Sequence, residues 1–133
     1  MSRSISLKIL IVDDEEIVRL TMTEQLHYLG YRANTAENGL LGIRELQEED
    51  YDAVFVDIRM PVLDGMGFLR QAKELYPEIQ VIVMTGHGSD ETREEVLASG
   101  AFGFLKKPFR LAEIRTLLKR LETEKQFDGQ PNT

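Results

Sequence analysis

The sequence predicts a doubly wound α/β domain, in which a parallel sheet is covered by helices on both faces. Five short apolar runs alternate with five stretches of helical periodicity, and this alternation is typical of repeated strand–helix units. Several of the runs are continuously apolar, as strands buried on both faces require. The connections are short, and right-handed crossovers between parallel strands then leave few possible topologies.

The first strand and helix are indicated by a change of pattern near residue 13. Residues 8–12 form a continuous apolar run, and an acidic cluster at residues 13–16 follows it. Acidic side chains suit the N-terminus of a helix, where the helix dipole is positive. Gly30 is a favourable C-terminal stop for this helix. Its expected apolar face is formed by Val18, Met22, Leu26 and Leu29.

The second unit combines a short strand at residues 31–36 with a helix that follows the turn signal Asn38-Gly39. Gly42 within this helix costs about 1 kcal/mol relative to alanine, so we expect close packing at that position. The helix carries three aliphatic side chains, Leu40, Ile43 and Leu46.

Three further strands are expected at residues 51–57, 81–84 and 101–105, each followed by a helix. The helix from about Ser89 to Ala98 is acidic, and the other two have apolar faces formed by Phe68, Ala72 and Leu75 and by Leu111, Ile114, Leu118 and Leu121. We place one domain at residues 1–122 and interpret the polar residues 123–133 as a tail or linker stub. The sheet is expected to be flavodoxin-like, with strand order 2-1-3-4-5 and five helices on both faces.

Composition excludes several classes of protein. The 133 residues fit one domain, and a net charge of −7 argues against nucleic-acid binding by this domain alone. The absence of cysteine excludes disulfides and thiolate metal sites. No apolar run approaches the roughly 18 residues of a membrane span, and the N-terminus lacks the apolar core of a signal peptide. We therefore expect a soluble, cytoplasmic protein.

Polar side chains follow four of the five expected strands, at the point where each strand ends. These residues are Asp13 and Asp14 after the first, Asp57 at the end of the third, Thr85 after the fourth and Lys107 after the fifth. The carboxyl ends of parallel strands lie at the same edge of a sheet, where ligands bind in open α/β folds. We therefore expect these five side chains to converge.

This set of groups predicts phosphoryl chemistry. Three neighbouring carboxylates require a counter-charge, and oxygen ligands favour Mg²⁺ or the similar Mn²⁺. Asp57 is then expected to act as a carboxylate nucleophile toward phosphorus and to form an aspartyl phosphate. The cation and Lys107 would neutralise the transferring group, Thr85 would donate a hydroxyl, and Gly86 would leave room for the phosphoryl group.

Each of these residues also has an ordinary structural interpretation. The pair Asp13-Asp14 is suited to helix capping, Thr85 to a structural role and Lys107 to a solvated surface. Their joint placement at four strand ends favours the functional interpretation. A dinucleotide site of the Rossmann type needs a glycine-rich first turn, and the acidic turn at residues 13–16 argues against it.

The motifs resemble the receiver domain of two-component response regulators over nearly the whole chain. They are Val12-Asp13-Asp14, Asp57-Ile58-Arg59-Met60-Pro61 with Asp64-Gly65, Met84-Thr85-Gly86 and Lys107-Pro108-Phe109. The resemblance implies that Asp57 accepts a phosphoryl group from a phosphohistidine of a sensor kinase or a phosphotransfer protein.

The resemblance also implies the ligands and the geometry of the site. Asp14 and Asp57 would bind Mg²⁺ directly, Asp13 would act mainly through water, and the main-chain carbonyl of Arg59 would complete the protein ligands. The family lysine directly precedes proline, so Lys107 is preferred over Lys106, and the Lys107–Pro108 peptide bond is expected to be cis.

The resemblance further implies a switch that couples Thr85 to Phe104, the aromatic residue of the fifth strand. Phosphorylation would draw Thr85 toward the phosphoryl group, and Phe104 would turn inward. The family more often has tyrosine here, and the alternative role of Phe104 is ordinary core packing. Arg59 and His87 lie two residues beyond Asp57 and Thr85, where we hypothesise that they tune dephosphorylation, although a solvated loop position also suits His87.

The expected partner surface consists of the fourth helix, the fifth strand and the fifth helix. The fourth helix is acidic and the fifth carries several arginine and lysine residues, a pairing that suits a two-fold homodimer. Solvated faces are the alternative for any single charge.

Three functions remain open from the sequence. The first is a phosphorylation-switched receiver, which catalyses only its own phosphorylation and dephosphorylation and is not an enzyme toward an external substrate. The second is a Mg²⁺-dependent phosphohydrolase with an aspartyl nucleophile, although Arg59 stands where such enzymes usually have a second carboxylate. The third is a receiver that binds partners without phosphorylation. The sequence of residues 57–61 and 84–88 is similar to that of regulators with transcriptional output modules.

Overall fold

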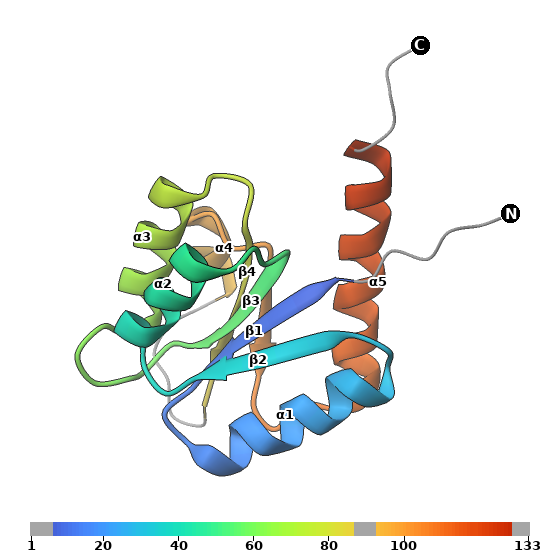
Figure 1. Cartoon of the computed structure of the whole chain (residues 1–133), viewed down its shortest axis with the longest axis horizontal. Helices are drawn as coiled ribbons and strands as arrows, with labels where there is room; N and C mark the ends of the chain where they lie inside the picture. The colour runs from blue at the N-terminus through green and yellow to red at the C-terminus, as the bar shows by residue number, and fades with distance from the viewer. Residues whose placement is uncertain (1–6, 87–92, 129–133) are drawn as a thin grey trace, which may run out of the picture.

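The structure is a computed structural model that describes residues 7–86 and 93–128. Its centre is a five-stranded parallel sheet in the order β2-β1-β3-β4-β5, as the sequence predicted (Figure 1). The strands are β1 (Lys8–Val12), β2 (Arg32–Ala36), β3 (Ala53–Asp57), β4 (Gln80–Thr85) and β5 (Gly103–Lys106). The order reverses between β1 and β3, which is where doubly wound sheets bind ligands.

The register of the sheet brings the strand ends level with one another. Val12 pairs with Val56 at the end of β1, and Asp57 pairs with Met84. Thr85 at the end of β4 pairs with Lys106 at the end of β5. The residues that follow β1, β3, β4 and β5 therefore begin at one edge of the sheet.

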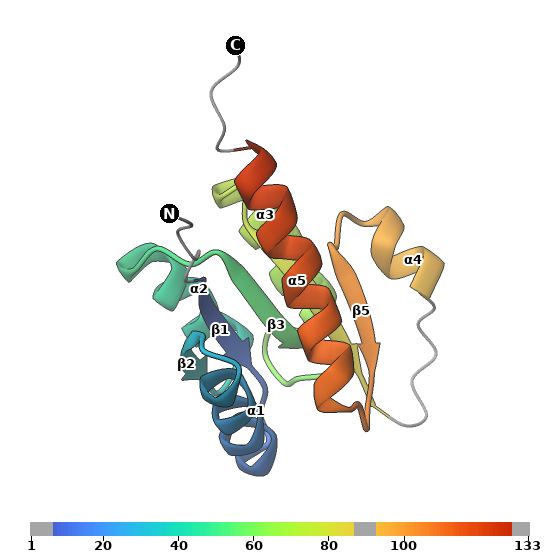
Figure 2. The same ribbon diagram turned by 90° about the vertical axis from the view of Figure 1, so that its right-hand side faces the viewer.

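Five helices cover the two faces of the sheet, again as predicted. They are α1 (Glu16–Tyr28), α2 (Gly39–Glu48), α3 (Gly65–Leu75), α4 (Arg93–Ala98) and α5 (Leu111–Asp128). Figure 2 shows α1 and α5 in front of the strands, with α3 behind α5. Among residues 7–86 and 93–128, no helix combines the length and the apolar character that crossing a membrane would need.

The strands supply two hydrophobic clusters, one on each face. Val54 and Val56 of β3 pack toward α2, α3 and α4, whereas Ala53 and Phe55 pack toward α1 and α5. All four side chains are fully buried. This two-sided burial explains why β3 is continuously apolar until its last residue, Asp57.

Two of the apolar residues that indicated helices α2 and α3 are on the surface. Leu40 and Leu75 are 53% and 49% exposed. The buried face of α2 is formed by Gly39, Gly42, Ile43 and Leu46, so it is displaced from Leu40 toward the glycines. Leu75 is the last residue of α3, and the buried part of that helix ends at Ala72.

The close packing predicted at Gly42 is confirmed. A Cβ atom at this position would lie 2.8 Å from the Phe68 ring and 3.0 Å from a methyl group of Val12. Gly42 therefore lets α2 approach β1 and α3, which helps to hold the loop after β1 in place.

The last two helices differ in extent from the sequence prediction. The helix α5 continues to Asp128, beyond the predicted boundary at residue 122. The described part of α4 begins at Arg93, and its predicted first residues lie outside the described part of the chain. The division into a domain at 1–122 and a tail at 123–133 stays a prediction.

We predict that Gly65→Ala destabilises the fold, because a Cβ atom at Gly65 would lie 2.5 Å from the main-chain oxygen of Asp57 and 2.6 Å from Cα of Ile58. Main-chain atoms of a buried strand end cannot move aside, and such overpacking costs about 1–3 kcal/mol of unfolding free energy. Urea denaturation would measure this loss.

Gly86→Ala is the matched control for that measurement, since a Cβ atom at Gly86 would have no neighbour within 4 Å. The two variants unfolding at the same urea concentration would contradict the packing argument at Gly65.

Candidate functional site

Asp57 ends the central strand and is only 6% exposed. The chain turns directly after it, where Ile58 N–H donates to the carbonyl of Met84 at 2.8 Å and Gly65 N–H donates to the carbonyl of Ile58 at 2.9 Å. These bonds fix the main chain on the C-terminal side of Asp57. Its carboxylate is therefore held at the edge of the sheet.

Asp13 and Asp14 follow β1 and reach the same edge, as predicted. Asp13 is fully buried, and its Oδ1 accepts a hydrogen bond from the N–H of Glu15 at 2.9 Å. Its carbonyl accepts from Nη1 of Arg19 at 2.8 Å. Asp14 is exposed. Carboxylate oxygens of Asp13, Asp14 and Asp57 all lie within 4.8 Å of one another.

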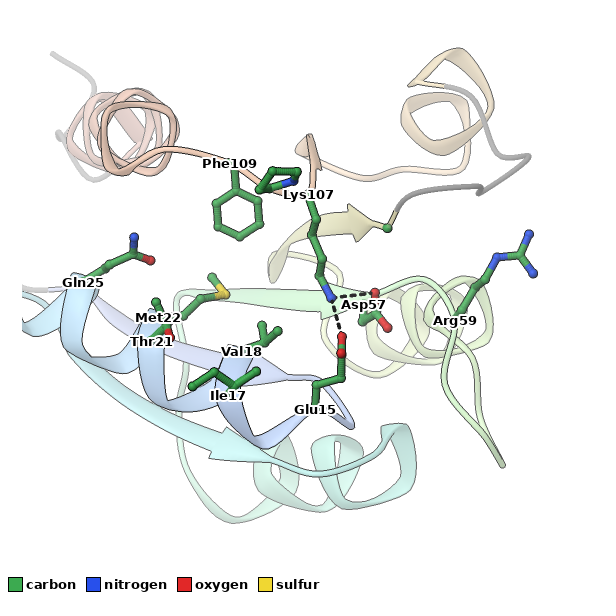
Figure 3. A pocket seen from close by; sticks show the side chains of 12 residues that line it. Glu15, Ile17, Val18, Thr21, Met22, Gln25, Asp57, Arg59, Lys107 and Phe109 are labelled. Carbon is green, nitrogen blue, oxygen red and sulfur yellow. Dashed lines mark hydrogen bonds and ion pairs between the residues drawn. The ribbon is translucent and has the colours of Figure 1, made fainter.

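Lys107 is the cation that faces these acids. Its Nζ donates to Oδ2 of Asp13 at 2.8 Å and lies 3.3 Å from Oδ1 of Asp57. Figure 3 shows the side chain extending from the β5–α5 loop toward Asp57 and Glu15. Its main-chain N–H donates to the carbonyl of Thr85 at 2.8 Å, which ties the loop to the end of β4. The predicted cis peptide bond between Lys107 and Pro108 is confirmed.

Glu15 is a contact of this site that the sequence analysis did not single out. Its Oε1 lies 3.5 Å from Nζ of Lys107. The only sequence signal was its position directly after Asp13-Asp14, and that position equally suited a role at the N-terminus of α1. The side chain is 60% exposed, so this contact is screened by water and contributes little.

Negative charge exceeds positive charge within this group, and the pKa values reflect it. Burial and then the charge of Asp13 raise the pKa of Asp57 from 3.8 to about 6, although Lys107 opposes the shift. Burial alone would lower the pKa of Lys107, but its hydrogen bond to Asp13 and the charges of Asp13 and Asp57 outweigh burial and raise it. A second cation would relieve the repulsion that remains.

The donor set fits a divalent metal ion. Asp13, Asp14 and Asp57 could together hold a metal ion, because each offers a carboxylate oxygen at mutual distances below 4.8 Å. Oxygen-only donors with one or two direct carboxylates are the environment that hard cations such as Mg²⁺ select. Arg59, two residues beyond Asp57, is exposed and lines the cavity next to Asp57.

Thr85 and Phe104 lie on neighbouring strands beside the acids. Thr85 is 3% exposed, and its hydroxyl lies 3.5 Å from the carbonyl of Gly86, which is long for an O–H···O bond. Phe104 is half-buried and packs against the cluster beneath α3 and α4. The Arg93 guanidinium lies 5.7 Å from the centre of its ring. His87, the other predicted tuning residue, lies outside the described residues.

The amino-acid sequence matches a known protein family and its members. The family model described as "Response regulator receiver domain" matches residues 9–119. The chain is 34% identical over 121 residues to the "DNA-binding transcriptional regulator NtrC" of Escherichia coli K12, covering 91% of this chain and 26% of that protein. It is 36% identical over 116 residues to a "Putative response regulator NtrX-like" of Rickettsia felis, covering 86% and 24%. The chain thus spans about a quarter of the length of these relatives.

Solved structures of response regulator proteins have a similar fold. A response regulator receiver domain protein from Clostridium thermocellum has a TM-score of 0.85 and 31% identity, covering 91% of this chain and 98% of that one. NtrX from Brucella abortus in complex with ADP has a TM-score of 0.86 and 28% identity, covering 93% of this chain and 29% of that one.

We predict that Asp57→Asn stabilises the metal-free protein at pH 8 by roughly 1–3 kcal/mol. The raised pKa of Asp57 means that its ionised carboxylate is less favourable in the folded state than in the unfolded state, and asparagine removes that charge. Between pH 3.8 and about 6, Asp57 is mostly protonated in the native state and mostly ionised in the unfolded state. The penalty is therefore complete above that window and absent below it. Denaturation in chelator from pH 4 to pH 8 would measure the difference.

Asp50→Asn is the control, because Asp50 is an exposed carboxylate that precedes the opposite end of β3. A stabilisation by Asp57→Asn that does not change between pH 4 and pH 8 would disprove the electrostatic explanation.

Proposed function

This chain belongs to the response regulator receiver domain family, and we propose that it is switched by transfer of a phosphoryl group from a sensor histidine kinase or phosphotransfer protein to Asp57. The observation that carries the proposal is the Asp57 carboxylate at the end of β3, with carboxylate oxygens of Asp13 and Asp14 within 4.8 Å and Lys107 Nζ 3.3 Å away. We further propose a cytoplasmic location, because a relative of the chain is a DNA-binding transcriptional regulator.

In the proposed reaction, a carboxylate oxygen of Asp57 attacks the phosphorus atom and the bond to the donor's leaving group breaks. Lys107 exchanges its contact with Asp57 for one with a phosphoryl oxygen, which its proximity to both Asp13 and Asp57 supports. Thr85 offers its hydroxyl to another phosphoryl oxygen. The domain acts on itself and has no external substrate to turn over.

A bound Mg²⁺ would neutralise the carboxylates and the charge on the transferring phosphoryl group. Asp14 and Asp57 would hold it directly, Asp13 through water, and the main-chain carbonyl of Arg59 would complete the protein ligands. The fit rests on the clustered carboxylate oxygens and on the raised pKa of Asp57, which together indicate uncompensated negative charge. Mn²⁺ suits the same donors.

Thr85 and Phe104 form the proposed switch. Among the residues that the structure describes, the Thr85 hydroxyl has only a long hydrogen bond, so a phosphoryl oxygen is a better partner for it. Its movement would open space for the Phe104 ring. In the described structure the Phe104 ring is half-buried with the Arg93 guanidinium 5.7 Å from its centre, and this cation–π contact stabilises the observed ring position against the proposed inward one. Arg59 and His87 remain proposed tuning residues for dephosphorylation.

The proposed partner surface is formed by α4, β5 and α5. Glu94 is exposed on α4, and Arg115 and Lys119 are exposed on α5. Opposite charges on adjacent elements suit pairing across a two-fold axis, so we keep a homodimer through this face as a proposal.

The alternative function, a phosphohydrolase, is less well supported, because Arg59 stands where such an enzyme usually has a second acid.

Incubation with acetyl phosphate and Mg²⁺ is expected to add the mass of one phosphoryl group to the chain. Asp57→Asn and addition of a chelator should each abolish the adduct, because they remove the nucleophile and the cation. Intact-protein mass spectrometry measures it. Asp50→Asn serves as the control and should be modified like the native chain. No adduct under any condition would disprove the assignment of Asp57.

Replacing Arg93 should shift the proposed switch before any phosphorylation. A cation–π contact at a partly exposed site is worth about 0.5–1 kcal/mol, so Arg93→Gln should raise the population with Phe104 inward about two- to fivefold. NMR of labelled phenylalanine rings, with Phe104 assigned from Phe104→Leu, measures this shift. Arg115→Gln is the control, and identical Phe104 signals in both variants would exclude the role of Arg93.

A further inference from the structure

A cavity of about 520 Å³ adjoins Asp57, between α1 and the start of the loop into α5 (Figure 3). Its volume lies within the range of roughly 300–1,000 Å³ that small-molecule sites occupy. At one end are Asp57 and Lys107, the two groups to which the proposed function assigns phosphoryl binding. The cavity is therefore continuous with the phosphorylation site.

The rest of the cavity wall is apolar over most of its surface, although the polar residues Glu15, Thr21 and Gln25 also line it. Ile17, Val18 and Met22 line it from α1, and Pro108 and Phe109 line it from the opposite side. In Figure 3 the side chains of Val18, Met22 and Phe109 lie on the same side of Lys107 and face a common space. Met22 is 1% exposed and belongs to the core, so this wall is backed by packed side chains.

The cavity thus joins a cationic contact to an apolar wall. Lys107 suits the anionic head of a ligand, and the α1 wall suits a hydrocarbon tail. Neither a free phosphate ion nor a purely apolar molecule would use both parts. A molecule that does so carries a phosphoryl group on an apolar leaving group.

We propose that this cavity binds the leaving group of small acyl phosphates and gives Asp57 a preference for donors with longer hydrocarbon chains. The inference rests on the proposed function of Asp57. Asp57 attacks the phosphorus atom, the bond between phosphorus and the acyl oxygen breaks, and a carboxylate leaves with the electron pair. No proton, oxidant or reductant is required, and the Mg²⁺ named above is the only addition.

The chain-length dependence can be estimated from burial. Full burial of one methylene corresponds to about a fourfold gain in affinity, so half-burial in an open groove corresponds to about twofold. Hexanoyl phosphate has four more methylenes than acetyl phosphate, which gives a roughly 15-fold higher rate of Asp57 phosphorylation at equal, subsaturating concentration.

The first experiment measures these rates by intact-protein mass spectrometry for acetyl, butyryl and hexanoyl phosphate. Val18→Thr keeps the side-chain shape but places a hydroxyl in the wall, and Ile17→Gln changes a residue that is 68% exposed and tolerant of polar groups. Each should lower the hexanoyl-to-acetyl ratio at least threefold. Leu20→Gln is the matched control, because Leu20 is 56% exposed on the same helix and does not line this cavity.

The second experiment uses alkylphosphonates, which bind but cannot transfer a phosphoryl group. Calorimetry with Mg²⁺ should show hexylphosphonate binding at least tenfold more tightly than methylphosphonate, and Val18→Thr should reduce that difference. This measurement decides the proposal even if no donor phosphorylates Asp57, a result that would count against the proposed function alone.

Two results would overturn the proposal. One is a hexanoyl-to-acetyl ratio near one together with equal binding of the two phosphonates. The other is an unchanged ratio in both Val18→Thr and Ile17→Gln. If, in addition, those variants slow transfer from a phosphorylated histidine kinase, the apolar wall contacts a side chain of the protein donor instead.

Discussion

The burial of Asp57 beside two other acids, with one lysine to face them, is the constraint on which the rest of the structure depends. A carboxylate at the end of a buried strand is unfavourable, and the raised pKa of Asp57 expresses that cost. Lys107 offsets part of it through contacts with Asp13 and Asp57. The remaining negative charge favours binding of a cation, which in the proposed function would prepare the site for a phosphoryl group. The same imbalance that destabilises the metal-free fold is what prepares it for the proposed function.

The fold maintains this constraint through its main chain. Lys107 is tied to Thr85, and Ile58 to Met84, by hydrogen bonds between loop and strand. Gly65 brings α3 against the carbonyl of Asp57, where any side chain would collide. These contacts leave the loop after β3 little freedom to move Asp57 away from Asp13. The carboxylates of Asp13 and Asp57 repel each other, but main-chain hydrogen bonds and the packing of Gly65 hold them close together.

The strands and the convergence of the acids could be predicted because both follow from local pattern. Continuous apolar runs identify buried strands, and parallel pairing then brings their ends to one edge. The exposure of Leu40 and Leu75 could not be predicted, because periodicity does not give the centre of a buried face, which on α2 includes its two glycines. The contacts of Glu15 with Lys107 and of Arg93 with Phe104 each join different elements of the fold, so the pattern within one element does not show which residues meet.

The arrangement of β4 and β5 suggests how the site and the proposed partner surface are coupled. Lys107 directly follows β5, and Phe104 lies on that strand, three residues before Lys107 and next to Arg93 of α4. Thr85 is hydrogen-bonded to the main chain of Lys107. A phosphoryl group that draws Lys107 and Thr85 toward itself would therefore act on both strands that support Phe104. A ligand shifts an equilibrium only through contacts that differ between the two states. In the proposed switch those differing contacts would be the long hydrogen bond of Thr85 and the cation–π contact of Phe104.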